Sequence, residues 1–133
     1  MKARVVLLAG MVLAISGAIL AQGRQAKSDP AIETFWTKFQ TAVAGGNKAA
    51  VLAMTGFPVT MPYGVSTIRT RAQLLRNYNK IFDSETKKCF AKAKPDADSK
   101  KRRFSISCGE AMMYWFEVRN GEYKFIAVDN VNE

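Results

Sequence analysis

The sequence predicts an α+β domain: three N-terminal helices packed on one face of a strongly curved antiparallel sheet. Two observations support this prediction. Apolar residues recur at helical spacing through most of residues 30–82, whereas apolar alternation and turn signals dominate residues 87–131. The helices therefore precede a run of strands instead of alternating with them. The predicted order is helix, helix, strand, helix, strand, strand, strand.

Length and composition limit the class of protein. The chain has 133 residues, of which 48% are hydrophobic and 23% charged, so we expect one globular domain and not a disordered chain. It has no histidine, the usual general base near neutral pH and the commonest metal ligand. Its two cysteines are too few for a zinc site. We therefore expect no metal and no cofactor.

The N-terminus has the pattern of a secretory signal peptide. Lys2 and Arg4 precede an apolar run at residues 5–20, and the small residues of Ala21-Gln22-Gly23 follow it. The alternative is an uncleaved membrane anchor, because the run is near the lower length limit for spanning a bilayer. We expect a signal peptide at 1–23, a short polar segment at 24–29 and a single domain at 30–133. The mature protein would be periplasmic or secreted, with no stable insertion in the membrane.

Three helices are expected in the first part of the domain. The first begins at Asp29-Pro30, where the aspartate can act as N-cap, and ends at Gly45-Gly46. Asn47 can cap a short second helix over residues 48–54. The capping box Thr70-Arg71-Ala72-Gln73 starts the third. The apolar stripes of the first and third helices are Ile32, Phe35, Trp36, Phe39 and Val43, and Leu74, Leu75, Tyr78, Ile81 and Phe82.

The remaining segments predict strands. Residues 57–63 alternate in polarity, but Pro58 and Pro62 restrict this strand to an edge of the sheet. Turn-forming residues at 95–99 and the strong hairpin signal Asn120-Gly121 separate three longer strands. These strands are expected at 87–94, 103–118 and 122–131.

Cys89 and Cys108 face each other if the first two long strands form a hairpin. That register separates an apolar face from a polar one, and a slip of one residue would mix them. In an oxidising compartment we expect the pair to form a structural disulfide, which would stabilise the fold by about 3 kcal/mol. The alternative is two buried free thiols.

The second hairpin has a register of its own. With Asn120-Gly121 as a two-residue turn, Arg119 lies opposite Glu122 and Glu117 opposite Lys124. One face then holds Met112, Tyr114, Phe116, Val118, Tyr123, Phe125, Ala127 and Asp129. The other face holds Met113, Trp115, Ile126 and Val128, and this apolar patch predicts a homodimer through the sheet. Within the preceding strand, Gly109 is expected to allow a bend.

Four segments carry a resemblance to a known superfamily over residues 30–131. They are Phe35 to Val43, Asn47 to Ala53 leading into Phe57-Pro58, Thr70 to Phe82, and Trp115-Phe116 with Gly121 to Ala127. As an ordered set they resemble exported bacterial members, of uncharacterised function, of the nuclear transport factor 2-like (cystatin-like cone) superfamily. The spacing from Gly109 to Trp115 is longer than in those members. The resemblance implies a cone-shaped domain, but the superfamily includes enzymes, transport factors and ligand-binding domains.

The resemblance also implies a pocket between the helices and the concave sheet. Its expected lining is Phe39, Met61, Tyr78, Phe82, Met112, Tyr114 and Phe116. Aromatic and methionine side chains suit a small apolar or amphipathic ligand. The alternative is a filled core without a cavity. A non-enzymatic ligand-binding or accessory domain is the favoured hypothesis.

An isomerase- or lyase-like enzyme is the first alternative. Enzymes of this fold use an Asp base with Tyr or His partners, and the predicted register puts Asp129 on the face of Tyr114. Burial there would raise the pKa of the carboxyl toward neutrality. The competing interpretation is an exposed Asp129 at a strand end, and Asp83 and Glu110 have less support. No catalytic pattern of the superfamily matches this sequence, so no catalytic residue is assigned.

A module that binds polyanions or membrane surfaces is the second alternative. Basic residues gather at Lys92, Lys94, Lys100, Lys101, Arg102 and Arg103, on the polar face of the first predicted hairpin. Only Phe90 interleaves as an aromatic, so nucleic acid is not an expected partner. A lipid headgroup or an acidic polysaccharide fits an exported protein better. The competing interpretation is a merely solvated face.

Overall fold

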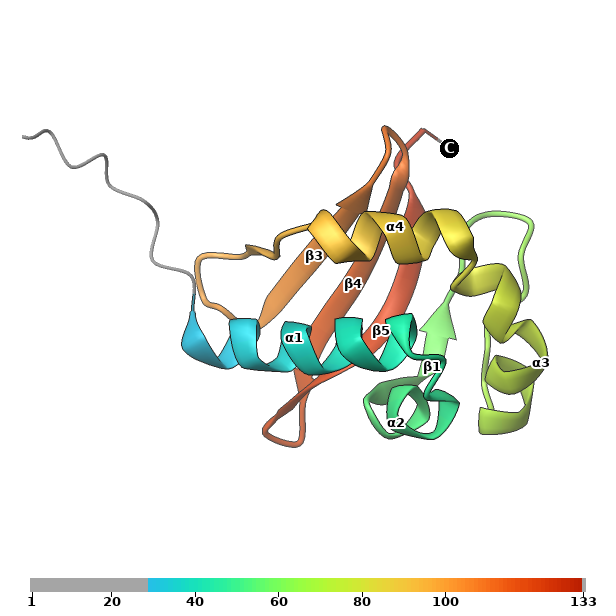
Figure 1. Cartoon of the computed structure of the whole chain (residues 1–133), viewed down its shortest axis with the longest axis horizontal. Coiled ribbons are helices and arrows are strands. Elements are labelled where there is room, and N and C mark those ends of the chain that lie inside the picture. Colours follow the sequence, from blue (N-terminus) through green and yellow to red (C-terminus); the bar gives the residue numbers. More distant parts are fainter. Residues whose placement is uncertain (1–28, 133) are drawn as a thin grey trace, which may run out of the picture.

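The computed structural model describes residues 29–132 as helices on one face of a five-stranded sheet (Figure 1). The elements are α1 (Pro30–Ala44), α2 (Lys48–Ala53), β1 (Thr55–Thr60), α3 (Arg71–Ile81), α4 (Ser84–Lys92), β2 (Asp96–Ala97), β3 (Arg103–Cys108), β4 (Met112–Arg119) and β5 (Glu122–Asn130). The strand order is β1-β5-β4-β3-β2. This confirms the α+β class. The predicted signal peptide at 1–23 lies outside the described residues, as does all of the 24–29 segment except Asp29.

The sheet is mixed, not antiparallel throughout as predicted. β1 runs parallel to β5, whereas the other neighbouring strands are antiparallel. β1 lies at an edge, where the missing N–H of Pro58 is tolerated. The strand ends at Thr60, so the predicted alternation up to residue 63 does not continue, and Tyr63 is 91% exposed.

The predicted helix starts are confirmed. The Asp29 carboxylate accepts a hydrogen bond from the Ala31 N–H, and Asn47 caps α2. At α3 the Gln73 N–H donates to Thr70 Oγ1, and Gln73 Oε1 accepts from the Thr70 N–H, both at 3.2 Å. Leu75 is 43% exposed and so lies outside the buried stripe of α3.

The strand predicted at 87–94 is wrong, because this segment is the helix α4. Asp83 is its N-cap and accepts from the Thr86 N–H at 2.8 Å. Thr86 and Phe90 are buried one helical turn apart, whereas Glu85 and Lys88 are exposed. Residues 29–132 therefore form four helices, and α1 and α4 cross the same face of the sheet (Figure 1).

The single strand predicted at 103–118 is also wrong. It is two strands, β3 and β4, that pair antiparallel around a turn after Cys108. Gly109 has φ +66°, a left-handed conformation that favours glycine, so it allows a full turn and not only a bend. The predicted register of the first hairpin is wrong because its first strand is the helix α4, and β3 pairs instead with β4 and with the short β2. The disulfide between Cys89 and Cys108 is confirmed, but it joins α4 to the end of β3.

The second hairpin follows its predicted register only near the turn. Arg119 lies opposite Glu122 and Phe116 opposite Phe125 as predicted. The two ion pairs, however, form along the strands: Glu117 with Arg119, and Glu122 with Lys124. Beyond Phe116 a β-bulge shifts the register by one residue, so the faces of the far part of β5 are reversed from the prediction.

The core lies between α1, α3, α4 and the inner face of the sheet, and aromatic rings dominate it. Phe116 is fully buried, stacks on Phe104 with ring centroids 4.6 Å apart, and meets Phe39 edge to face at 4.9 Å. Ring pairs in such geometries add to the free energy gained by burial. This cluster fixes the helices over β3, β4 and β5.

Candidate functional site

A cavity of about 580 Å³ lies between α3, the 61–68 loop, the first residues of β4 and the last residues of β5. Most of its wall is apolar: Met61, Val65, Ile68, Ile81, Met112 and Val128. Ser66, Asn77 and Lys80 add polar groups, and Lys80 is exposed to solvent. The site therefore offers an apolar surface beside one ammonium group, the combination that an amphipathic molecule requires.

The predicted pocket residues divide into two groups. Met61, Met112 and Tyr114 line this cavity. Phe39, Tyr78, Phe82 and Phe116 are at most 1% exposed and belong to the core, outside the cavity wall. Their helical or alternating spacing identified buried positions but could not tell a core position from a cavity wall.

Sequence reasoning missed the contribution of the loop and of the side of α3. Val65 and Ser66 reach the cavity because the chain leaves the sheet after Thr60 and returns at Ile68, which exchanges hydrogen bonds with Val59. Asn77 and Lys80 lie three residues apart on one side of α3. The sequence signal that could have identified them as cavity residues was their helical spacing next to the apolar Ile81.

Tyr114 presents a buried phenol at the cavity. Its hydroxyl lies 3.0 Å from Thr86 Oγ1 and 3.5 Å from the carbonyl oxygen of Ile81, to which it donates. Burial raises the pKa of Tyr114, the negative charge of Asp83 raises it further, and the hydrogen bond with Thr86 lowers it. The phenol is therefore neutral at physiological pH.

Asp129 does not join Tyr114, contrary to the prediction. The bulge in β5 places Asp129 opposite Met113 on the outer face, whereas Tyr114 lies opposite Val128 on the inner face. Asp129 is exposed. The predicted acid–base pair is therefore divided by the sheet.

The other carboxylates considered as candidates lie elsewhere in the described structure. Asp83 caps α4 through the Thr86 N–H. Glu110 is exposed in the β3–β4 turn. No aspartate or glutamate is among the residues that line the cavity, all of which belong to the described range.

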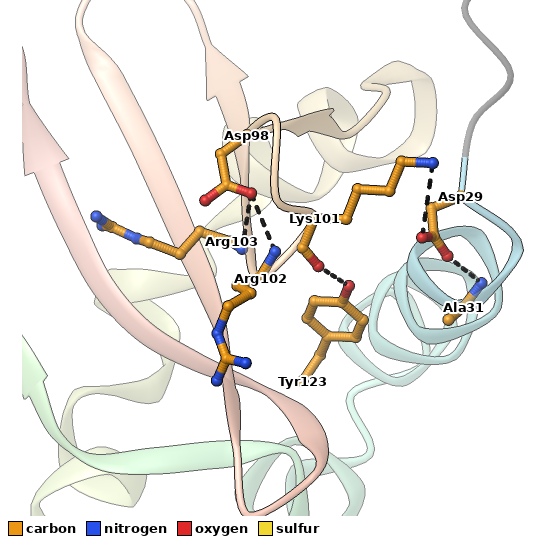
Figure 2. Close-up of polar contacts among 7 residues, drawn as sticks. All are labelled: Asp29, Ala31, Asp98, Lys101, Arg102, Arg103 and Tyr123. Atoms are coloured by element: carbon orange, nitrogen blue, oxygen red, sulfur yellow. Dashed lines mark hydrogen bonds and ion pairs between the residues drawn. The ribbon is translucent and has the colours of Figure 1, made fainter.

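The predicted basic residues do not share a hairpin face. Lys92 ends α4 and Lys94 follows it. Residues 100–102 lie in the turn before β3, and Arg103 is the first residue of that strand. All six are exposed, but acidic groups lie among them (Figure 2). Asp98 Oδ1 accepts hydrogen bonds from the backbone N–H groups of Arg102 and Arg103, and Lys101 Nζ lies 3.9 Å from Asp29 Oδ2.

Tyr123 holds this turn in place. Its hydroxyl donates to the carbonyl oxygen of Lys101 (Figure 2). Burial and the nearby charges of Asp29 and Asp98 raise the pKa of Tyr123, while Arg102 lowers it. Specific contacts therefore hold the turn in place, and it lies among charges of both signs.

The outer face of the sheet is less apolar than predicted. Val128 is 3% exposed and points to the inner side, and Ile126, the extra residue of the bulge, is 9% exposed. Trp115 and Met113 remain on the outer face, with the Arg103 guanidinium 4.6 Å from the centre of the Trp115 ring. A shallow groove of about 470 Å³ includes Trp115 and Asp129.

Residues 29–132 lack two features that would indicate other classes of protein. They contain no group of three or more His, Cys, Asp or Glu side chains placed to hold a metal ion. Over the same residues, no helix has both the length and the apolar character needed to cross a bilayer.

Comparison with known proteins adds information on the fold. No protein-family model and no curated protein match the sequence. Among solved structures, the chain is similar to the extracytoplasmic function sigma factor SigJ of Mycobacterium tuberculosis, with a TM-score of 0.52 and 15% identity over 77% of this chain and 42% of SigJ. It is also similar to LinA, with a TM-score of 0.43 and 12% identity over 74% of this chain and 81% of LinA. The chain thus spans less than half the length of SigJ. Both proteins have the nuclear transport factor 2-like fold, and the likeness to SigJ supports that fold for this chain.

Proposed function

We propose that this protein binds a small apolar or amphipathic ligand in the cavity between α3, the 61–68 loop and the sheet. The observation that carries the proposal is the apolar wall around a space of about 580 Å³, within the range of small-molecule sites. Met61 and Met112 provide flexible, polarisable surface that adapts to ligands of different shape.

The polar groups of the cavity favour an amphipathic ligand with an acidic head. Lys80 supplies a positive charge and no carboxylate lines the described cavity. One N–H of the Asn77 amide donates to the Gln73 carbonyl at 2.8 Å, which leaves the amide oxygen available to a ligand donor. Proton transfer by Asp129 and Tyr114 is not part of the proposal, because the sheet separates them.

The proposal includes export, which rests on the signal-peptide pattern of residues 1–23 and is compatible with the disulfide. The expected outcome is a mature protein in the cell envelope or medium that begins near Gln22 or Arg24. Intact-mass measurement checks this, and retention of residues 1–21 would contradict it.

Two neighbouring methionines provide a matched test of ligand binding. Met112 lines the cavity, whereas Met113 lies on the outer face. We expect 1-anilinonaphthalene-8-sulfonate, an anionic amphiphile, to bind the wild type saturably. Met112→Trp should fill the cavity and weaken binding by more than tenfold, and Met113→Trp should leave it unchanged.

Urea unfolding of both variants shows whether each is folded. Absence of saturable binding to the wild type would overturn the proposal. Equal weakening by the two substitutions would also overturn it, because the probe would then bind away from the cavity.

A further inference from the structure

The stretch of sequence that forms the 61–68 loop and α3 carries basic residues and no acidic ones, and the next acidic residue, Asp83, caps α4. Residues 34–82 contain six lysines and arginines and no aspartate or glutamate. These six are Lys38, Lys48, Arg69, Arg71, Arg76 and Lys80. None of them forms an ion pair with another described residue. The segment from β2 to the start of β3, residues 96–103, differs, because it contains Asp96 and Asp98, and its Lys101 pairs with Asp29 (Figure 2).

An exposed apolar turn lies in the 61–68 loop, which lines the cavity together with Lys80. The Val65 N–H donates to the Pro62 carbonyl at 3.0 Å, and Gly64 has φ +79°, so the four residues form a tight turn. Tyr63 is 91% and Val65 55% exposed, although both are large and apolar. In Figure 1 the segment between β1 and α3 arches out beyond the edge of the sheet.

This turn and the basic side of α3 border the same opening. Val65 from the loop and Lys80 from α3 both line the cavity. Arg76 lies one helical turn before Lys80 and so on the same side of α3. The backbone N–H of Arg69 donates to Gln73 Oε1 at 2.6 Å, which places Arg69 beside the first turn of the helix.

We propose that this surface docks on an anionic phospholipid bilayer. Tyr63 and Val65 enter the headgroup region, where tyrosine is favoured, and Arg69, Arg76 and Lys80 face the anionic headgroups. A second copy of the chain is a poorer occupant, because a symmetric contact would bring the same positive charges together. Docking itself does not depend on the proposed ligand. Only its consequence, delivery of an amphiphile from the bilayer to the cavity mouth, rests on the proposed function.

The test compares variants that carry the same N-terminus, in co-sedimentation with vesicles of phosphatidylcholine alone or with added phosphatidylglycerol. We expect the wild type to prefer the anionic vesicles and to be released as NaCl rises from about 0.1 to about 0.5 M. Arg69→Gln/Arg76→Gln/Lys80→Gln should weaken binding by more than tenfold, and Tyr63→Ser/Val65→Ser should weaken it as well. The control Lys92→Gln/Lys94→Gln/Arg102→Gln removes equal charge from the other basic region and should change binding less than twofold.

Hydrogen exchange of the full chain locates the contact. Anionic vesicles should slow the exchange of backbone amides in 61–69. Equal binding to neutral vesicles, equal loss in the control, or unchanged exchange in 61–69 would overturn the proposal. Met112→Trp separates the two proposals, because it blocks the cavity and should leave vesicle binding intact.

Discussion

Tyr78 has a buried hydroxyl group without a hydrogen-bond partner among the described residues. The residue is 1% exposed, and its ring lies 5.1 Å from that of Phe82. A buried unpaired hydroxyl is unfavourable, so we predict that Tyr78→Phe raises the free energy of unfolding by about 1 kcal/mol in urea denaturation. Tyr123→Phe is the matched control and should lower it, because the Tyr123 hydroxyl donates to Lys101. Destabilisation by Tyr78→Phe would show that the hydroxyl has a favourable partner.

Alkaline pH should destabilise the domain through its buried tyrosines. Burial raises the pKa of Tyr78, Tyr114 and Tyr123 in the folded state. A raised folded pKa means that the unfolded chain ionises first, near pH 10, so this contribution to stability is complete below about pH 10 and is lost as pH rises through the folded values. Urea midpoints measured from neutral to alkaline pH should fall, and less so in Tyr78→Phe. Equal pH dependence in that variant would contradict the role of Tyr78.

Single residues were predictable where the signal is local. The caps Asp29, Asn47 and Thr70 each act within three residues, so the sequence contains the whole interaction. Asp129 was misplaced because one extra residue in β5, Ile126, reverses the faces that follow it. No local sequence pattern predicts that bulge.

At the scale of elements, α4 explains the main error. The Cys89–Cys108 bond needs only a short Cα–Cα distance, here 5.7 Å, which a helix packed on a strand provides as well as two paired strands do. Pairing the cysteines therefore predicted the correct bond and the wrong element. The sequence signals for a helix were Asp83 as a possible N-cap and the four-residue spacing of Thr86 and Phe90, both of which the structure buries.

The disulfide should stabilise the attachment of α4 to β3. It joins residues 19 apart, so Cys89→Ala/Cys108→Ala should lower the free energy of unfolding by about 3 kcal/mol through the added entropy of the unfolded chain. Urea denaturation measures the loss, and reducing agent should destabilise the wild type but not the variant. A wild type whose unfolding is insensitive to reduction, and whose thiols label in the native protein, would contradict the bond.

For the whole molecule, the class was predictable and the topology was not. Segregated helical and strand patterns indicate an α+β domain from local periodicity alone. The pairing of β1 with β5 joins segments more than sixty residues apart and is parallel, and hydrophobic alternation does not encode either property. Only part of the cavity lining was predicted, because residues of the 61–68 loop complete the wall and hydrophobic alternation does not encode the path of a loop.

The homodimer remains a prediction, and substitution of Trp115 on the outer face of the sheet tests it. Pro58 on the edge strand β1 opposes edge-to-edge pairing, so association is expected through the outer face around Trp115 and Met113. In sedimentation equilibrium the wild type should be dimeric at high concentration. Trp115→Glu should give a monomer, because it would bury a charge in the interface. Leu75→Glu, on the exposed side of α3, should remain dimeric, and a monomeric wild type or equal dissociation of both variants would exclude this interface.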